Sequence, residues 1–271
     1  MNNSNNFNDI LSVLDTINKE VNVPVFVPSL NREVKFKSIN TGQQKTLLKA
    51  AVDNPVFQTR FTIALYNLIL ENCTEKSIMP ALTTIDSAAI AIQLRVFTNG
   101  VDHVLQQNNR RFKVNLQDIV DKIKSVSQTK DDTIVSDPFT INVGAPTFME
   151  QFNLEKQLRE KTVNDQQVMS AQLTETIGDA FIGEVSKFIK EITVTKDGAD
   201  QQFNYKNLLY TKRHAVLEKI PTTSIKGVLK YMADYVNIQK DFLTITGTDV
   251  DTGEVVNDLV LLVDTTLFII S

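Results

Sequence analysis

The sequence predicts an α+β protein that is predominantly helical, with an N-terminal β-hairpin and a small C-terminal antiparallel sheet. Three observations support this fold class. Only 9 Gly and 7 Pro occur among 271 residues, about half their usual frequencies of roughly 7 % and 5 %. Over most of the chain, apolar residues recur every three or four positions, which is the spacing of a helix that buries one face. Alternating or continuous apolar runs, typical of strands, lie near the two ends.

The N-terminal part is expected to begin with a flexible segment and then a hairpin. Residues 1–20 are Asn-rich and then weakly amphipathic, which predicts a flexible N-terminus with a short helix. Two β-like runs follow at 23–27 and 34–39, and turn residues separate them. The two prolines of the first run place that strand at a sheet edge, because proline has no N–H for the ladder. We expect this hairpin to belong to a domain over residues 21–130.

Four helices are expected in this first domain, each from an apolar stripe. Thr41 and Gln44 have the spacing of a capping box, so the first helix is predicted to begin at Thr41. Pro55 opens the second helix, at a position suited to a first helical turn. The other two are predicted at about 84–97 and 115–126.

The character of the sequence changes at residues 131–145, which are expected to form a linker with short strands. The remainder, residues 146–271, is predicted to be a helical domain with C-terminal strands. Its expected elements are a helix near 146–161, a long apolar stripe from Leu173 to Ile192, a hairpin at Lys196-Asp-Gly198, helices at 205–219 and 223–241, and strands at 242–246 and 259–270. The Asp-Gly pair is a strong hairpin signal.

Composition excludes several classes of protein. One cysteine cannot form an intrachain disulfide, and one Cys with two His cannot supply a structural zinc site. The formal charge of −4 argues against a dedicated nucleic-acid binder. The polar start is unlike a signal peptide, and no run of about 18 apolar residues occurs. We therefore expect a soluble protein made in the cytoplasm, with neither nucleic acid nor membrane as a partner.

No motif predicts catalysis, a cofactor or a metal. Asp249-Val-Asp-Thr-Gly253 resembles a calcium loop, but glycine falls at the fifth position rather than the sixth, so a surface turn is the better interpretation. His103 and His214 lie far apart in the sequence, and Cys73 lies on the apolar stripe of its helix. The chain is predicted not to be an enzyme and to need no cofactor.

Charge is unevenly distributed in the last quarter of the chain. Residues 206–240 contain seven Lys and Arg and two acids, a net charge of +5, whereas residues 241–271 contain six acids and no Lys or Arg, a net charge of −6. The basic helices and the acidic tail can attract each other or guide a charged partner. Alternatively, both are ordinary solvated faces. The short basic segment Arg110-Arg-Phe-Lys113 is too small to indicate nucleic-acid binding.

The closing residues 259–270 form nearly continuous apolar runs interrupted at Asp264. Such strands must be covered on both faces or pair with a neighbouring chain. Two interpretations remain open: a buried strand of the protein's own sheet, or a strand docked in an assembly.

Particular residues resemble the T4-like phage baseplate hub subunit family. The resemblance is carried by Val25–Phe36, Ile39–Lys45, Leu48-Lys-Ala50, Phe61–Leu65, Asn72-Cys73, Glu191–Val194, Phe203-Asn-Tyr205, Pro221, Val263-Asp264 and Leu267-Phe268. It covers roughly residues 21–100 and 175–270 and leaves 101–174 without a counterpart. It implies a structural or assembly role in the baseplate hub of a contractile tail, in the virion, with synthesis in the host cytoplasm. It implies no active site.

The expected function is protein–protein binding to other phage baseplate and tail proteins, with self-association as a further possibility. The alternatives are a tail or hub assembly chaperone that is absent from the virion, and an unrelated soluble adaptor. The residues predicted to contact partners are Val25, Phe26, Phe36, Lys212, Arg213, Lys226, Lys230, Leu261, Leu267 and Phe268.

Overall fold

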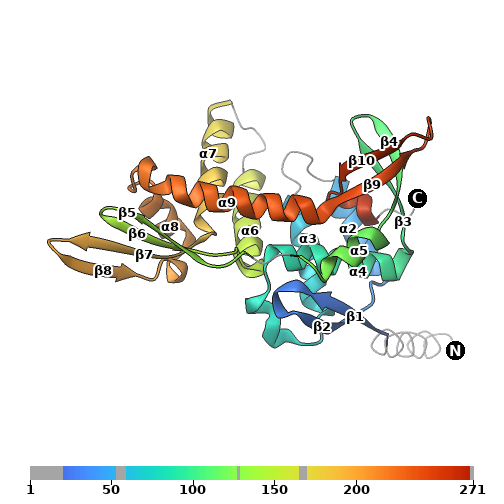
Figure 1. Ribbon diagram of the computed structural model, residues 1–271, viewed down its shortest axis with the longest axis horizontal. Coiled ribbons are helices and arrows are strands. Elements are labelled where there is room, and N and C mark those ends of the chain that lie inside the picture. The colour runs from blue at the N-terminus through green and yellow to red at the C-terminus, as the bar shows by residue number, and fades with distance from the viewer. Residues whose placement is uncertain (1–20, 53–58, 127–128, 165–169, 269–271) are drawn as a thin grey trace, which may run out of the picture. The chain divides into compact units, whose positions relative to one another are not determined.

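The chain divides into two compact units. The computed structural model describes residues 21–52, 59–126, 129–164 and 170–268. Unit 1 combines Met1–Val126 with Phe242–Ser271, and unit 2 is Ser127–Asp241, so unit 2 is inserted in the sequence of unit 1 (Figure 1). The flexible segment and helix predicted at 1–20 lie outside the described residues.

Unit 1 consists of helices, a hairpin and a four-stranded sheet. Its elements are β1 (Asn22–Val27), η1 (Pro28–Leu30), β2 (Arg32–Lys37), α2 (Thr41–Val52), α3 (Thr59–Asn72), η2 (Lys76–Ala81), α4 (Thr84–Asn99), β3 (Asp102–Gln107), β4 (Arg110–Asn115), α5 (Gln117–Ile123), β9 (Thr244–Asp249), β10 (Val255–Val260) and η4 (Thr265–Phe268).

The core of unit 1 surrounds α4, which is buried over most of its length. The helix begins with a capping box in which Thr83 and Asp86 exchange hydrogen bonds, and it ends at Gly100 with φ 83°. Three alanines among its buried residues allow neighbouring elements to approach closely. Because β1, η1, α3, α5 and η4 all pack against it, α4 determines how the rest of the unit is arranged.

The predicted N-terminal hairpin is confirmed, and α4 covers its outer edge. β1 and β2 pair antiparallel, with Val25 opposite Val34. The Gln93 side chain of α4 accepts from the Phe26 N–H and donates to the Phe26 carbonyl, both at 2.9 Å. It thereby takes the place of a third strand. The predicted capping box of α2 lies one residue earlier, between Asn40 and Gln43, because the short Asn side chain caps a helix as well as Thr does.

The second sheet of unit 1 brings distant parts of the chain together. Its order is β10-β9-β4-β3, with every neighbouring pair antiparallel. β3 and β4 form a tight hairpin whose turn residues, Asn108 and Asn109, have φ values of 52° and 61°. β9 then adds to β4, so the sheet needs residues from both sides of the insertion.

Unit 2 contains a second four-stranded antiparallel sheet, of order β5-β6-β7-β8. Its elements are β5 (Asp132–Ser136), β6 (Phe139–Val143), α6 (Phe148–Asn164), α7 (Ser170–Ser186), β7 (Ile189–Lys196), β8 (Ala199–Phe203), η3 (Tyr205–Asn207), α8 (Tyr210–Leu217) and α9 (Thr222–Leu243), the last two residues of α9 belonging to unit 1.

Aromatic packing stabilises unit 2. Phe188 packs edge-on against Tyr231 and Tyr235 of α9, with ring centroids 6.2 and 5.4 Å away. Gly227 allows α9 to lie close to β5, because a Cβ there would come within 2.5 Å of the Ile134 side chain. The hairpin predicted at Lys196-Asp-Gly198 is confirmed as the β7–β8 turn.

The predicted fold class is wrong. The described residues contain two four-stranded sheets besides the hairpin, so the fold is a mixed α+β structure rather than a helical protein with one hairpin and a small C-terminal sheet. The strands that sequence reasoning missed are short. β3 and β4 bury only two residues each, and so short an alternation is a weak signal.

The predicted segments also differ from the units of the structure. The residues predicted as a linker with short strands, 131–145, contain β5 and β6, which belong to the unit 2 sheet. Of the strands predicted at 259–270, only the end of β10 is present. The chain then continues through an irregular stretch to η4, and 269–270 lie outside the described residues.

Candidate functional site

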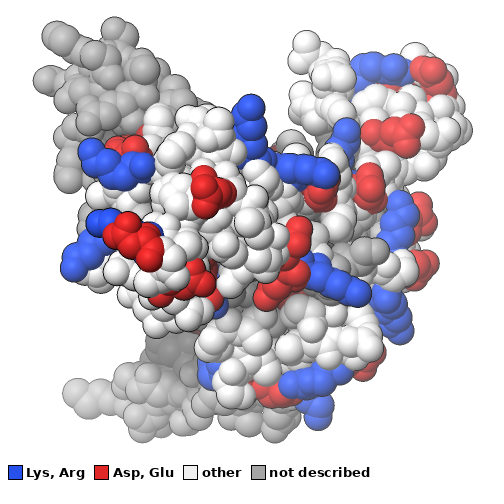
Figure 2. Space-filling view, turned by 60° about the vertical axis from the view of Figure 1, so that its left-hand side comes forward, with Lys and Arg blue, Asp and Glu red and all other residues white. Residues whose placement is uncertain are grey.

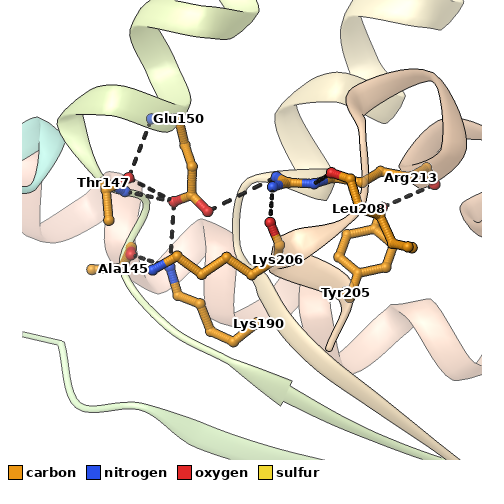
Figure 3. Close-up of polar contacts among 8 residues, drawn as sticks. All are labelled: Ala145, Thr147, Glu150, Lys190, Tyr205, Lys206, Leu208 and Arg213. Carbon is orange, nitrogen blue, oxygen red and sulfur yellow. Dashed lines mark hydrogen bonds and ion pairs between the residues drawn. The ribbon is translucent and has the colours of Figure 1, made fainter. Parts of the chain in front are cut away.

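A polar cluster of unit 2 centres on a carboxylate at the start of α6 (Figure 3). Glu150 Oε2 accepts from the backbone N–H and hydroxyl of Thr147, at 2.9 and 3.0 Å, while the Glu150 N–H donates to the Thr147 hydroxyl. This capping box fixes the Glu150 side chain, which is only 9 % exposed.

Two cations from other elements face this carboxylate. Lys190 of β7 places its Nζ 3.5 Å from Glu150 Oε2 and donates to the carbonyl of Ala145 at 2.7 Å. Arg213 of α8 places Nη1 3.9 Å from Glu150 Oε1. Burial lowers the pKa of Lys190, and the charge of Glu150 partly opposes that effect. One buried carboxylate therefore joins α6, β7 and α8.

Arg213 is held further by its own neighbourhood. Its Nε donates to the carbonyl of Leu208 at 3.0 Å, and its Nη2 donates to that of Lys206. The Tyr205 hydroxyl donates to the Arg213 carbonyl, and the guanidinium lies 5.8 Å from the Tyr205 ring centroid. Burial raises the pKa of Tyr205 to about 12. The side chain of Arg213 is thus a structural link, with 14 % exposure.

A second buried cation, Arg95, holds the C-terminal segment in unit 1. Its Nε donates to the Leu267 carbonyl at 2.7 Å, and Nη1 and Nη2 donate to the carbonyls of Gly100 and Asp102. Gln44 donates to the Phe268 carbonyl at 3.1 Å, and the Phe268 ring packs on Phe61. These contacts place η4 against α2, α4 and β3.

The acidic tail pairs with the short basic segment of β4. Arg110 contacts Asp249 at 2.6 Å and Glu254 at 2.7 Å, and Arg111 contacts Asp251 at 3.1 Å. Asp249 also accepts from the backbone N–H groups of residues 251 and 252, so the interpretation of this stretch as a turn is confirmed. These hydrogen bonds, first that from Thr252 and then that from Arg110, lower the Asp249 pKa from 3.8 to about 2.

The ionisable residues considered for catalysis are held within the fold. His103 is buried, and burial followed by the nearby Arg95 charge lowers its pKa. The His214 Nε2 lies 2.9 Å from the carbonyl of Asp179. Cys73 is buried, and burial raises its pKa. Within the described ranges, no three His, Cys, Asp or Glu side chains are grouped to hold a metal ion.

The residues predicted to contact partners fall into two groups. Those that are buried or mainly enclosed are Val25, Phe26, Phe36, Arg213, Leu261, Leu267 and Phe268, with Phe26 half-buried. Those that are exposed are Lys212, Lys226 and Lys230. The structure does not gather the ten into one surface, because the apolar members belong to the core of unit 1. On the face drawn in Figure 2, basic and acidic side chains are interspersed.

Several exposed apolar side chains escaped sequence reasoning. They are Phe97, Val135, Phe181, Phe203, Leu209 and Val255, each at least half exposed. Exposed apolar residues are common singly, but Val135 and Phe203 lie on β5 and β8, the two edge strands of the unit 2 sheet. The Asp-Gly hairpin signal, which predicts a strand on each side of the turn, was the one that could have drawn attention to Phe203.

A family model described as T4 bacteriophage base plate protein matches residues 18–242. The chain belongs to this family. The match includes residues 101–174, which the resemblance to hub subunits had left without a counterpart, and β9, β10 and η4 lie beyond it.

Membership of the baseplate family rests on this match, since no curated protein and no solved structure matches the chain. The match supports a structural role in a phage baseplate, among other baseplate proteins. No helix in the described part of the chain is long and apolar enough to cross a membrane.

Proposed function

We propose that the protein is a structural or assembly component of the baseplate hub of a contractile-tailed bacteriophage, located in the tail baseplate of the virion and acting by protein–protein binding. The family match over residues 18–242 is the observation that carries the proposal. The resemblance of the N-terminal hairpin and the Asn-Thr-Gly-Gln-Gln helix start to hub subunits adds the hub assignment.

Binding rather than catalysis is supported by how the ionisable groups are used. Glu150, Lys190 and Arg213 bridge three elements of unit 2, and Arg95 ties a backbone segment in place. Catalytic groups need a reacting atom within hydrogen-bond reach and a pKa suited to proton transfer. The buried His103 has a pKa lowered further from neutrality, so its chemistry is that of a core residue.

The exposed lysines of α8 and α9 are the part of the predicted contact surface that a partner can reach. Lys226 and Lys230 are four residues apart on α9 and so share one face, and Lys212 is exposed on α8. Among the described residues no ion pair involves these three side chains. We propose that an acidic surface of a neighbouring baseplate or tail protein binds here, with binding accelerated by charge steering.

Mass spectrometry of purified phage particles and of isolated baseplates tests the proposal. We expect peptides of this chain in both, at a constant ratio to other baseplate proteins. If the chain is absent from particles but co-purifies with hub or tape-measure proteins from infected cells, it is an assembly chaperone. If it associates with neither, the baseplate proposal is wrong.

A charge-reversal variant tests the lysine surface separately. Changing Lys212, Lys226 and Lys230 together to Glu should leave folding intact, because all three side chains are exposed, and should reduce incorporation into baseplates. The matched control changes three exposed lysines of unit 1, Lys35, Lys45 and Lys113, to Glu. Equal incorporation of both variants would exclude the α8–α9 surface as a contact.

A further inference from the structure

The outer strand of the unit 2 sheet, β8, is exposed along its whole length. All five residues, Ala199–Phe203, are exposed, and the strand packs extensively against β7 alone. Its pairing with β7 is regular, from Ile192 opposite Phe203 to Lys196 opposite Ala199. An edge strand carries unpaired N–H and C=O groups on its outer side, which another strand can bind.

In unit 1, other sheet edges are protected by recognisable means. Gln93 occupies the outer edge of β1, and the Thr74 N–H donates to the Lys35 carbonyl at the outer edge of β2. β10 has a register shift between Val256 and Leu259, and such a bulge interrupts a pairing edge. Arg95 binds the Asp102 carbonyl of β3.

In unit 2, β5 lies beneath a helix. The Ser136 hydroxyl donates to that of Ser224 on α9, and Ile134 lies against Gly227 of the same helix. By contrast, β8 has neither a bulge nor a proline nor a lysine, and Asp200 is its one charged residue. It is the most open edge in the described part of the chain.

An apolar row crosses the sheet and ends at this open edge. Ile134, Ile141, Ile192 and Phe203 are successive cross-strand partners on β5, β6, β7 and β8. Ile141 and Ile192 are buried, whereas Phe203 is 50 % exposed. The last side chain of this row, Phe203 on β8, is therefore only half covered.

We propose that β8 pairs antiparallel with β8 of a second copy of the chain, about a two-fold axis at Gln201, so that the two unit 2 sheets join into one. Directly opposite residues in such a pair would be Gln201 with Gln201, Asp200 with Gln202, and Ala199 with Phe203. The exposed ring of Phe203 would then cover the small Ala199 of the partner.

Charge favours this register over its neighbours. An axis at Asp200 would place two aspartates directly opposite each other, which is destabilising, and an axis at Gln202 would overlap fewer residues of β8. With the axis at Gln201, the turn end of each hairpin, which carries Lys196, Asp197 and Asp200 and so a net charge of −1, approaches the other end of its partner, where Lys206 is exposed. The β8 edge of one copy is thus complementary to the β8 edge of a second copy.

Cysteine cross-linking tests the pairing directly. Opposite Cα atoms in antiparallel strands lie about 4.5–5.5 Å apart, within the roughly 4.4–6.8 Å that a disulfide spans. The chain has a single native cysteine, Cys73, and it is buried. Under mild oxidation Gln201→Cys should form a disulfide-linked dimer. The control Val135→Cys, at the opposite sheet edge and 76 % exposed, should form no disulfide-linked dimer.

Two substitutions of Gln202 test the register, because they are expected to change the dissociation constant of the dimer in opposite directions. Gln202→Lys places an ammonium group opposite Asp200 of the partner, twice by symmetry. It should lower the dissociation constant of the dimer about fivefold. Gln202→Asp places a carboxylate there and should weaken the dimer by a similar factor. Sedimentation equilibrium of the purified full chain measures both, and circular dichroism confirms that the exposed substitutions leave the fold unchanged.

The outcomes are separate from those for the baseplate role, because the purified chain alone is used. A wild-type chain that stays monomeric across the concentration series, with no cross-link at residue 201, overturns the inference. So does a dimer that cross-links at residue 135, or one whose dissociation constant is the same for both Gln202 variants. A chain absent from phage particles that still dimerises through β8 would refute only the proposed function.

Discussion

The guanidinium of Arg95 donates from Nε to the backbone carbonyl of Leu267, 2.7 Å away, and so joins α4 to the last turn that the structure describes. Its other two nitrogens donate to the carbonyls of Gly100 and Asp102. The cation is buried among carbonyl groups, with Asp102 contributing a favourable charge interaction. One side chain therefore secures both the end of α4 and the C-terminal segment.

Arg95→Met should destabilise unit 1 by on the order of 3 kcal/mol, because it leaves three carbonyl groups without their donor. Arg95→Lys should recover only part of this loss, since one ammonium group cannot reproduce the planar arrangement of three donors. Chemical denaturation measures both. The matched control Arg32→Met removes an exposed ion pair with Glu75 and should lower the unfolding free energy far less than Arg95→Met does.

Hydrogen exchange locates the effect of the Arg95 substitutions. Faster exchange of the Leu267 N–H, which donates to Asp264, is expected in Arg95→Met, with the β7–β8 hairpin unchanged. Uniform acceleration in both units would contradict a local role for Arg95.

Arg213 and its neighbour Lys212 should respond differently to the same substitution. Arg213→Ala removes the links to Glu150, Leu208 and Lys206 and should lower the unfolding free energy of unit 2 by about 2 kcal/mol. Lys212→Ala removes an exposed side chain and should change it by less than about 0.5 kcal/mol. Thermal unfolding followed by circular dichroism distinguishes them, and equal effects would show that the Glu150 cluster is not structural.

Asp249 should contribute to the acid sensitivity of unit 1. Its folded-state pKa is depressed from 3.8 to about 2, so the stability it provides is present above pH 4 and is lost as the pH falls towards 2. Asp249→Asn should be less stable than wild type at pH 7 and should show a shallower decline between pH 4 and 2. Denaturant titrations at several pH values measure this. A parallel decline in both proteins would contradict the role of Asp249.

The raised pKa of Glu155 predicts that its contribution to stability depends on pH in the opposite direction. Burial raises its pKa to about 6, the Gln151 hydrogen bond opposes the change, and Glu184 reinforces it. The folded state therefore holds this proton more tightly than the unfolded chain, so stability falls as the pH rises from 4.5 to 6. Glu155→Gln should stabilise the protein at pH 8 by about 2 kcal/mol at most and remove this part of the pH dependence.

The control for Glu155 is Glu184→Gln on α7, whose side chain is 37 % exposed and forms an ion pair with Lys187. It should produce a smaller gain at pH 8. If Glu155→Gln gives the same stability as wild type at pH 8, the carboxyl group is not desolvated in the folded protein.

Local signals in the sequence predicted local structure well. The Asp197-Gly198 pair predicted its hairpin because a type of turn with positive φ at both positions needs such residues. The equivalent Asn108-Asn109 turn was missed, because the flanking strands contain few apolar residues. Longer-range relationships were not predictable: the pairing of β9 with β4 depends on residues more than a hundred positions apart.

The residues predicted to contact partners also show that long-range relationships could not be predicted from the sequence. Continuous apolar sequence at Leu267 and Phe268 is compatible with a docking strand or with a core, and only the tertiary structure shows that unit 1 encloses both. Arg213 looked like part of a basic surface, although its carboxylate partner, Glu150, lies far away in the sequence. Periodicity identifies a buried face but not what covers it.

On the ribosome, unit 1 cannot be completed before unit 2 has been made. β4 needs β9 as its second neighbour, and Arg95 needs the Leu267 carbonyl, yet both partners follow residue 241. Unit 2 is contiguous in sequence and emerges whole before them. The nascent N-terminal part therefore has one side of β4 unpaired until the residues after unit 2 are translated, and only pairing with β9 ends this exposure to aggregation.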